Sequence, residues 1–188
     1  MFQTIAEDLR ASVDAGRRTG LKFWIYLLGR SAITPQVHAL LLYRFGSALR
    51  GTPLWPLAYL LKAAGIVWAG ADIHPKARIG PGFVLAHGPG VTIGADVHAG
   101  RNLRVNSGSN IGAMRMTEPL DPSRPTHIGD NVFVGANAMI LQDCHIGDGA
   151  VIGANSVVTR DVAPLTVVSG IPAKPVRTLE KPFLGHQD

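Results

Sequence analysis

The chain has 188 residues, of which 46% are hydrophobic, and this suffices for one domain with a packed core, with or without a small appendage. Its formal net charge of +5 at pH 7 indicates an anionic partner. The basic residues are scattered and only 6% of the residues are aromatic, so no stacking platform for nucleic acid is expected, and a phosphorylated small molecule fits the charge equally well. The single cysteine, Cys144, excludes an internal disulfide and fits a reducing cytoplasm.

The first 70 residues have the apolar spacing expected of helices. Four segments show it, with breaks between them: residues 4–14, 21–29, 35–50 and 54–68. The start of the chain lacks the continuous apolar stretch of a secretion signal. The most apolar run, 54–69, is interrupted by Pro56 and Lys62 and is shorter than the roughly 20 residues of a membrane span. We therefore expect a helical domain over residues 1–70 in a cytoplasmic protein, with attachment at the inner face of the membrane as the alternative.

From Ile73 onward, an aliphatic residue recurs at every sixth position, with one interruption after Leu103. The series consists of Ile73, Ile79, Leu85, Val91, Val97, Leu103, Ile128, Val134, Ile140, Ile146, Ile152 and Val158. A period of six fits neither an α-helix nor an isolated strand. It is typical of a coil of three short strands, each with one inward aliphatic side chain, stacked on further coils into parallel sheets. Each coil then takes about 18 residues, and the stacked aliphatic residues form a continuous core.

Small or modest-sized residues follow each aliphatic residue of the second half by four positions, where the coil must turn a tight corner. They are Val132, Ala138, Cys144, Ala150, Ser156 and Val162. Between the two halves, the polar and proline-rich sequence GAMRMTEPLDPSRPTH predicts a loop extruded from the coils at about residues 112–127. We place the β-helix over residues 71–178 and a C-terminal tail over residues 179–188.

This pattern resembles that of the hexapeptide-repeat acyltransferases from about Asp72 to Arg177. The resemblance implies a mainly β fold, a left-handed parallel β-helix with an N-terminal helical domain; the hand of the winding comes from the family and not from the spacing. The segment ADIHPKARIGPGFVLAHGPGVTIG looks like the serine acetyltransferase family and its relatives. In that family the histidine at the position of His87 is the general base, and an acid fifteen residues earlier, here Asp72, orients it. Because fifteen is three less than one coil, we expect Asp72 in the adjacent coil, across a corner.

These residue types suit acyl transfer to a hydroxyl group. An alcohol attacks a thioester poorly unless its proton is removed as the new bond forms, and a neutral imidazole is suited to remove it. A carboxylate on the far ring nitrogen would fix the tautomer and stabilise the imidazolium. The alternative for His87 is a purely structural histidine.

Three features with which serine acetyltransferases recognise the charged groups of the amino acid are changed in this chain. The Asp-Pro-Ala of the helical domain is missing, Ala86 replaces the acid before the base, and Pro125 stands where the family has the histidine of Arg-His-Pro. The match is closer to the colanic-acid-type branch of exopolysaccharide O-acetyltransferases, through EDLRA, the histidine-glycine pair and HIG at His127. We therefore expect an acetyl-CoA-dependent O-acetyltransferase acting on a sugar hydroxyl. Serine O-acetylation and a non-catalytic binding or scaffold role are the alternatives.

Further site residues follow from the resemblance. The candidates for contact with the acceptor are Asn106, Asn110 and His127. Acetyl-CoA is the implied donor, lying in a groove between neighbouring β-helices. The residues expected to contact it are Gly135, Ala136, Gly153, Ala154, Lys174 and Arg177. Because a second subunit completes the groove, the family also implies a homotrimer.

Two histidines of the second half suggest a metal site. His127 and His145 are eighteen residues apart and should stack one coil apart. The carbonic-anhydrase-like relatives of this fold need three converging histidines, and the sequence assigns no third one. We therefore expect no metal, and an ordinary solvated corner residue is the alternative for His145.

Overall fold

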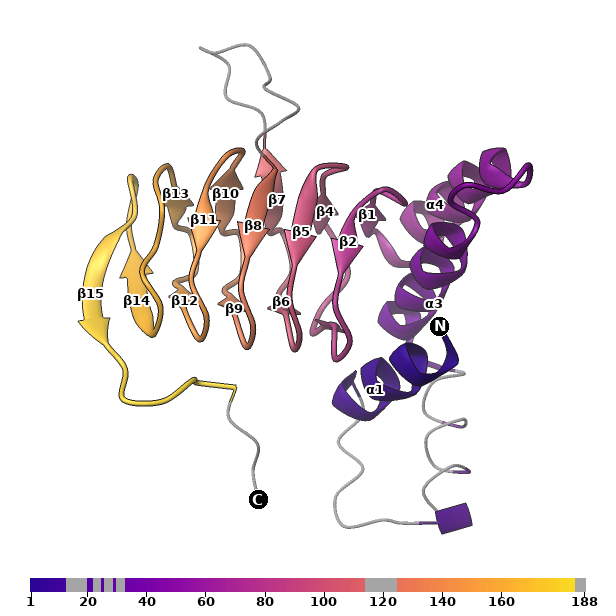
Figure 1. Cartoon of the computed structure of the whole chain (residues 1–188), viewed down its shortest axis with the longest axis horizontal. Coiled ribbons are helices and arrows are strands. Elements are labelled where there is room, and N and C mark those ends of the chain that lie inside the picture. The colour runs from indigo at the N-terminus through magenta and orange to yellow at the C-terminus, as the bar shows by residue number, and fades with distance from the viewer. Residues whose placement is uncertain (13–19, 22–24, 26–28, 30–32, 114–124, 185–188) are drawn as a thin grey trace.

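The computed structural model describes residues 1–12, 20–21, 25, 29, 33–113 and 125–184. Within these residues the chain forms three helices and then fifteen short strands (Figure 1). The helices are α1 (Phe2–Ser12), α3 (Pro35–Ala48) and α4 (Trp55–Ala69). Much of the predicted helical segment 21–29 lies outside the described residues, as do residues 114–124 of the predicted loop and residues 185–188 of the predicted tail.

The strands stack in three sheets, A, B and C, that form the sides of a triangular prism. Sheet A contains β1 (Asp72–Ile73), β4 (Thr92–Ile93), β7 (Asn110–Ala113), β10 (Met139–Leu141) and β13 (Val157–Val158). Sheet B contains β2 (Arg78–Ile79), β5 (Val97–Ala99), β8 (Thr126–Ile128) and β11 (His145–Ile146). Sheet C contains β3 (Val84–Leu85), β6 (Arg104–Val105), β9 (Phe133–Val134), β12 (Val151–Ile152), β14 (Thr166–Ser169) and β15 (Lys174–Thr178). The predicted fold class is confirmed: the chain is a left-handed parallel β-helix with N-terminal helices.

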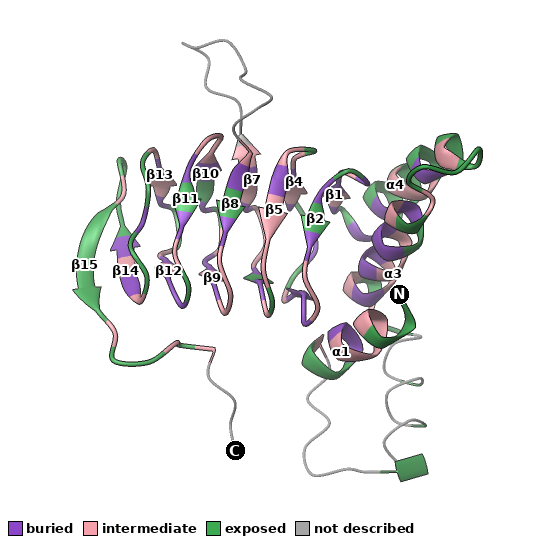
Figure 2. Cartoon of the chain, viewed as in Figure 1, coloured by how far each residue is buried: buried purple, intermediate pink, exposed green. Residues whose placement is uncertain are grey.

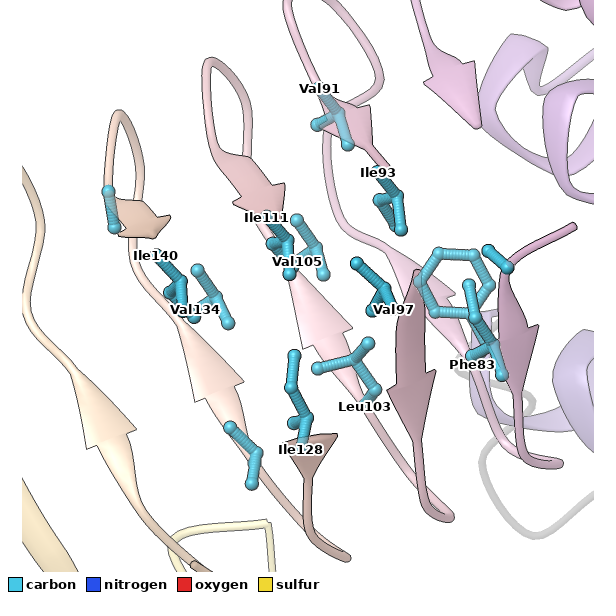
Figure 3. Packing of buried hydrophobic residues seen from close by; sticks show 14 of the residues in the cluster. Phe83, Val91, Ile93, Val97, Leu103, Val105, Ile111, Ile128, Val134 and Ile140 are labelled. Atoms are coloured by element: carbon cyan, nitrogen blue, oxygen red, sulfur yellow. The ribbon is translucent and has the colours of Figure 1, made fainter. Parts of the chain in front are cut away.

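The six-residue series forms the core of the prism. All twelve of its aliphatic side chains are buried, with at most 6% of each residue exposed. Figure 3 shows part of this core, with Val97, Leu103 and Ile128 among the labelled residues. The six small residues predicted at corners, Cys144 among them, are buried as well. The corners are tight because successive coils lie one strand spacing apart. At Gly135, for example, a Cβ atom would lie 2.6 Å from the backbone nitrogen of Ala154, so a larger residue would separate two coils.

The first coil is longer than predicted. Ile73 pairs with Ile93 and not with Val91, so this coil takes 20 residues, whereas Ile93 pairs with Ile111 after the expected 18. The two additional residues lie between Leu85 and Ile93. The sequence concealed them because Val91 is also aliphatic and buried, although it sits at a corner and not in the ladder of facing strand residues.

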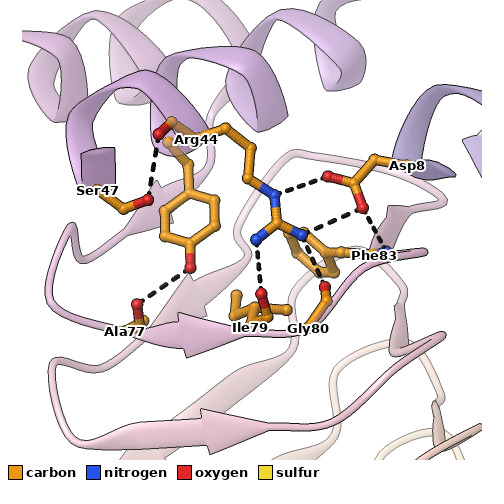
Figure 4. A network of polar contacts seen from close by, with 8 residues as sticks. Asp8, Arg44, Ser47, Ala77, Ile79, Gly80 and Phe83 are labelled. Atoms are coloured by element: carbon orange, nitrogen blue, oxygen red, sulfur yellow. Dashed lines mark hydrogen bonds and ion pairs between the residues drawn. The ribbon is translucent and has the colours of Figure 1, made fainter. Parts of the chain in front are cut away.

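A buried ion pair joins the helices to the β-helix (Figure 4). The guanidinium of Arg44, on α3, donates from Nε to Asp8 of α1 over 2.7 Å and also binds the carbonyl oxygens of Ile79 and Gly80. Asp8 in turn accepts the backbone N–H of Phe83 over 2.9 Å. Burial raises the pKa of the Asp8 carboxyl, and the hydrogen bond and charge of Arg44 oppose this rise. Removing either Asp8 or Arg44 would therefore leave the other buried charge without its counter-charge, which is energetically costly.

The far end of the prism is closed differently. After β14, the chain turns back and β15 pairs with β14 in antiparallel orientation, the one antiparallel pairing among the described strands. All five residues of β15 are exposed (Figure 2). Among the described residues, no helix is long and apolar enough to cross a membrane.

Replacing Asp8 with alanine should strongly destabilise the protein. The substitution leaves the buried Arg44 guanidinium without a counter-charge, which costs about 3–5 kcal/mol of the free energy of unfolding, measured by urea denaturation. The matched control is Glu7→Ala, because Glu7 pairs with Arg101 at an exposed site and should contribute at most about 1 kcal/mol. Equal effects of the two substitutions would contradict the role assigned to the buried pair.

Candidate functional site

His87 lies in the widened corner of the first coil, after β3. The corner folds onto the C-terminal end of α4: the N–H of Gly90 donates to the carbonyl of Gly70 over 2.9 Å. Gly88 must be glycine here, because a Cβ atom would lie 2.7 Å from the carbonyl oxygen of Ala69. The side chain of His87 is exposed at this corner. This agrees with a reactive role better than with a structural histidine sealed in the prism.

The predicted hydrogen bond between Asp72 and His87 is absent from the part of the chain that the structure describes. Asp72 opens β1, and its carboxylate binds Nζ of Lys62, on α4, over 2.8 Å. Both ends of the pair remain partly exposed, with 23% of the lysine and 36% of the aspartate side chain accessible. A cation binds a carboxylate more strongly than a neutral imidazole does, which accounts for the difference. The two residues are still neighbours through the backbone, because Asp72 N–H donates to Val91 O at the end of the His87 corner.

The edge between sheets C and A carries most of the predicted site residues. Successive corners along this edge are joined by backbone hydrogen bonds. They run from Ala86 N to Val105 O (2.9 Å), Gly108 N to Pro89 O (2.9 Å), Asn137 N to Ser107 O (2.8 Å) and Asn155 N to Ala136 O (2.9 Å). The residues predicted to bind the donor, Gly135, Ala136, Gly153 and Ala154, therefore continue the line of corners that starts at His87. The other two, Lys174 and Arg177, are exposed on β15.

The three predicted acceptor contacts lie in different places. Asn106 is beside the His87 corner, in the next coil, and its Nδ2 donates to Val134 O over 2.9 Å. Asn110 pairs with Thr92 on sheet A, near the same edge. His127 is exposed on sheet B, which is the side of the prism opposite this edge. A single chain therefore does not bring His127 to His87.

The sequence analysis missed one side chain next to this corner. Gln36, near the start of α3, lies against Gly88, where a Cβ atom would be 3.6 Å from its Cγ. Its Oε1 is buried and has no hydrogen-bond partner among the described residues. A buried acceptor without a partner is uncommon and calls for a donor. No pattern in the sequence singles out Gln36, because the helical region has no repeat that would align it with the coils.

Three histidines form a ladder on the outer face of sheet B. His127 and His145 are in register and stacked, with ring centroids 5.4 Å apart, as predicted. His98 joins them, 5.5 Å from His127, and Arg78 is in register with His98. The sequence concealed His98 because its 29-residue separation from His127 is one coil of 18 plus the eleven residues 114–124.

The electrostatic environment of the ladder is positive. The pKa of His98 is lowered mainly by burial and then by Arg78 and His127, and Asp96 opposes this change. Among the described residues, no group of three or more histidine, cysteine or acidic side chains is placed to hold a metal ion.

Comparisons with known proteins place this geometry in a family. The description of bacterial transferase hexapeptide repeats (six repeats) matches residues 125–160. The chain is 34% identical to the serine acetyltransferase of Bacillus subtilis, an alignment that covers all of this chain and 84% of the relative. The crystal structure of the Neisseria gonorrhoeae serine acetyltransferase superimposes with a TM-score of 0.79 at 36% identity, covering 96% of this chain and 68% of the other. The chain belongs to the serine acetyltransferase family.

Other members of this family bring further information. A serine acetyltransferase solved in complex with CoA is 28% identical and superimposes with a TM-score of 0.76. The match covers 93% of this chain and 68% of that chain. The chain spans about half the length of the plant relatives it matches, 44% of an Arabidopsis thaliana protein and 56% of one from Oryza sativa.

The predicted action on a sugar or exopolysaccharide hydroxyl is wrong. The relatives and structural neighbours are named as serine acetyltransferases, and the resemblance to the colanic-acid-type branch is not supported. The prediction gave too much weight to Ala86, Pro125 and the missing Asp-Pro-Ala, three local changes in a chain whose similarity to the family extends over its whole length. Recognition of an acceptor can move to other side chains while the scaffold is retained.

Arg78→Gln should raise the pKa of His98. The substitution removes a neighbouring positive charge, so the imidazolium becomes less unfavourable and the pKa moves back towards 6.5, as followed by NMR titration of the histidine ring. Arg104→Gln, an exposed arginine on sheet C, is the matched control and should leave the titration unchanged. An unaltered His98 pKa in the Arg78 variant would contradict the positive field assigned to the ladder.

Proposed function

We propose that this protein is a serine O-acetyltransferase that moves the acetyl group of acetyl-CoA to the hydroxyl of L-serine. Membership of the family supports the reaction class, and relatives have been solved with serine and with CoA. The observation that carries the proposal is the exposed imidazole of His87, on a corner two residues longer than the regular repeat.

His87 acts as the general base. Its neutral ring removes the hydroxyl proton of serine as the oxygen attacks the carbonyl carbon of the acetyl thioester. The tetrahedral intermediate then collapses, the carbon–sulfur bond breaks, and the imidazolium returns the proton to the departing thiolate of CoA. Acetyl transfer is thus direct, and no group on the protein becomes acetylated.

Asp72 orients His87 in the reacting complex. Its carboxylate has two oxygens, and the bond from Lys62 to Oδ1 leaves Oδ2 available for the imidazole N–H. Lys62 would then hold the carboxylate in place.

The acceptor is recognised differently from the family pattern. Because Ala86 and Pro125 carry no charge, we assign the ammonium group of serine to the buried Oε1 of Gln36, beside the corner. Asn106 and Asn110 remain proposed contacts from the adjacent coil. His127, on the opposite side of the prism, would reach this site only from another subunit.

The donor lies along the edge between sheets C and A. Gly135, Ala136, Gly153 and Ala154 present backbone groups there, and Lys174 and Arg177 are the proposed partners of the nucleotide phosphates. A homotrimer completes the groove in this proposal. The exposed apolar residues of α4, including Leu60, Val67 and Trp68, are consistent with further contact between subunits.

His87→Ala should abolish most of the activity. Loss of the general base lowers kcat/KM by about 10²- to 10⁴-fold, measured as release of the CoA thiol from acetyl-CoA in the presence of L-serine. His145→Ala, an exposed histidine of the ladder, is the control and should retain activity. Undiminished turnover by the His87 variant would remove the mechanism, and absence of turnover by the unaltered protein would favour the non-catalytic role.

Gln36→Leu should impair the recognition of serine. The variant loses the acceptor for the ammonium group, so kcat/KM for L-serine falls about tenfold or more. The comparison acceptor is 3-hydroxypropanoate, which has the hydroxyl and carboxylate but no ammonium, and the variant should use it as well as the unaltered protein does. Equal losses with both acceptors would show that Gln36 supports the structure and does not select the amino acid.

A further inference from the structure

A pocket on the opposite side of the molecule is lined by basic side chains. It has a volume of about 370 Å³ and lies where the α3–α4 connection meets the start of sheet B. Arg50, Trp55, Lys76, Arg78 and His98 line it, together with Gly51 and Ala95. A second hollow of about 590 Å³ shares Arg50 and Arg78 with it and extends along the junction that Figure 4 shows. Among the described residues, no acidic side chain lines either space.

Arg50 is fixed in a binding orientation. Its Nη2 donates to the carbonyl oxygens of Pro75, Lys76 and Ala77 over 3.1, 3.2 and 3.1 Å. These bonds use one nitrogen of the guanidinium, so Nε and Nη1 keep donors for a ligand. A guanidinium that is already ordered loses little entropy on binding an oxyanion.

The other basic groups lack counter-charges. In the described part of the chain, neither Lys76 nor Arg78 forms an ion pair, although both line the pocket. His98 adds an imidazole, and the ladder continues from it to His127 along the same face. Asp96 acts on His98 without lining the pocket, and the three cations that line it outnumber this acid and produce a positive potential that attracts small anions. Trp55 provides an apolar wall on which a ring can stack.

We infer that this pocket is a binding site for a phosphate group carried by a small molecule, held by Arg50, Lys76 and Arg78 with His98 at its rim. A tetrahedral oxyanion accepts several hydrogen bonds at once and matches the forked donors of the two arginines. The site accounts for part of the excess positive charge of the chain, which the reaction at His87 does not use.

Within one chain, the pocket is separate from the donor and acceptor residues of the proposed function. It opens on sheet B, whereas His87 and the proposed donor residues lie on the edge between sheets C and A. The inference therefore does not depend on the acetyl transfer, and either can fail without the other.

The experiment titrates the full-length protein with inorganic phosphate and follows the ring signals of His98 by NMR and the heat of binding by calorimetry. Phosphate should shift the His98 signals in a saturable manner. Arg78→Gln should weaken phosphate binding about tenfold or more, because it removes a charge-assisted pair of hydrogen bonds. Arg50→Gln should weaken phosphate binding as well. Arg78 is the primary variant because Arg50 also donates hydrogen bonds to backbone carbonyls of the fold.

Three controls decide between the outcomes. Arg104→Gln, on sheet C, should leave the affinity for phosphate unchanged. Saturation with CoA should also leave it unchanged, and competition by CoA would instead make the pocket part of the donor site and overturn the inference. If AMP binds more tightly than inorganic phosphate, the adenine ring contributes by stacking on Trp55. If AMP and phosphate bind with equal affinity, the pocket recognises the phosphate group alone. Absence of saturable binding, or equal affinity in the Arg78 variant, would overturn the site itself.

Discussion

The structure depends on the stacking of inward aliphatic side chains, one for each strand of each coil. This stacking buries nine of the twelve members of the six-residue series and sets the distance between coils at a single strand spacing, while Val91, Val97 and Leu103 are buried beside the ladder. At that distance a side chain at some corner positions would separate two coils, as the close approach of Gly135 to Ala154 shows. The exposed edges of the prism become straight lines of backbone and short polar side chains, and the chemistry is arranged along them.

The same constraint explains why a small departure from the repeat has a large effect. Two additional residues in the first coil leave the core unbroken, because Val91 is still buried. They lengthen the corner that carries His87, and this corner lies beside Gln36 of α3 and the C-terminal end of α4, the helix that also carries Lys62. The helices thus help to build the site, and the buried pair of Asp8 and Arg44 holds them in place.

The sequence predicted the fold because a period of six has one simple physical interpretation. It could not predict features that arise from a change of period. The 20-residue coil was hidden by Val91, and the third histidine of the ladder, His98, was hidden by the eleven residues 114–124. Side-chain partners across the helical junction, such as Lys62 for Asp72, have no periodic signal at all. The acceptor was mistaken because local substitutions were weighed above similarity along the whole chain.

The reversed strand β15 has a consequence for the behaviour of the chain in concentrated solution. An open stack of parallel coils offers unpaired N–H and C=O groups at its last rung, where another molecule could add its own rung and start a filament. At the C-terminal end, β15 lies across β14 in the opposite direction, with lysine, arginine and proline in its sequence. At the other end, α4 packs on β1. β15 thereby covers the C-terminal edge of sheet C and α4 covers β1 of sheet A, and addition of another molecule at these two edges is discouraged.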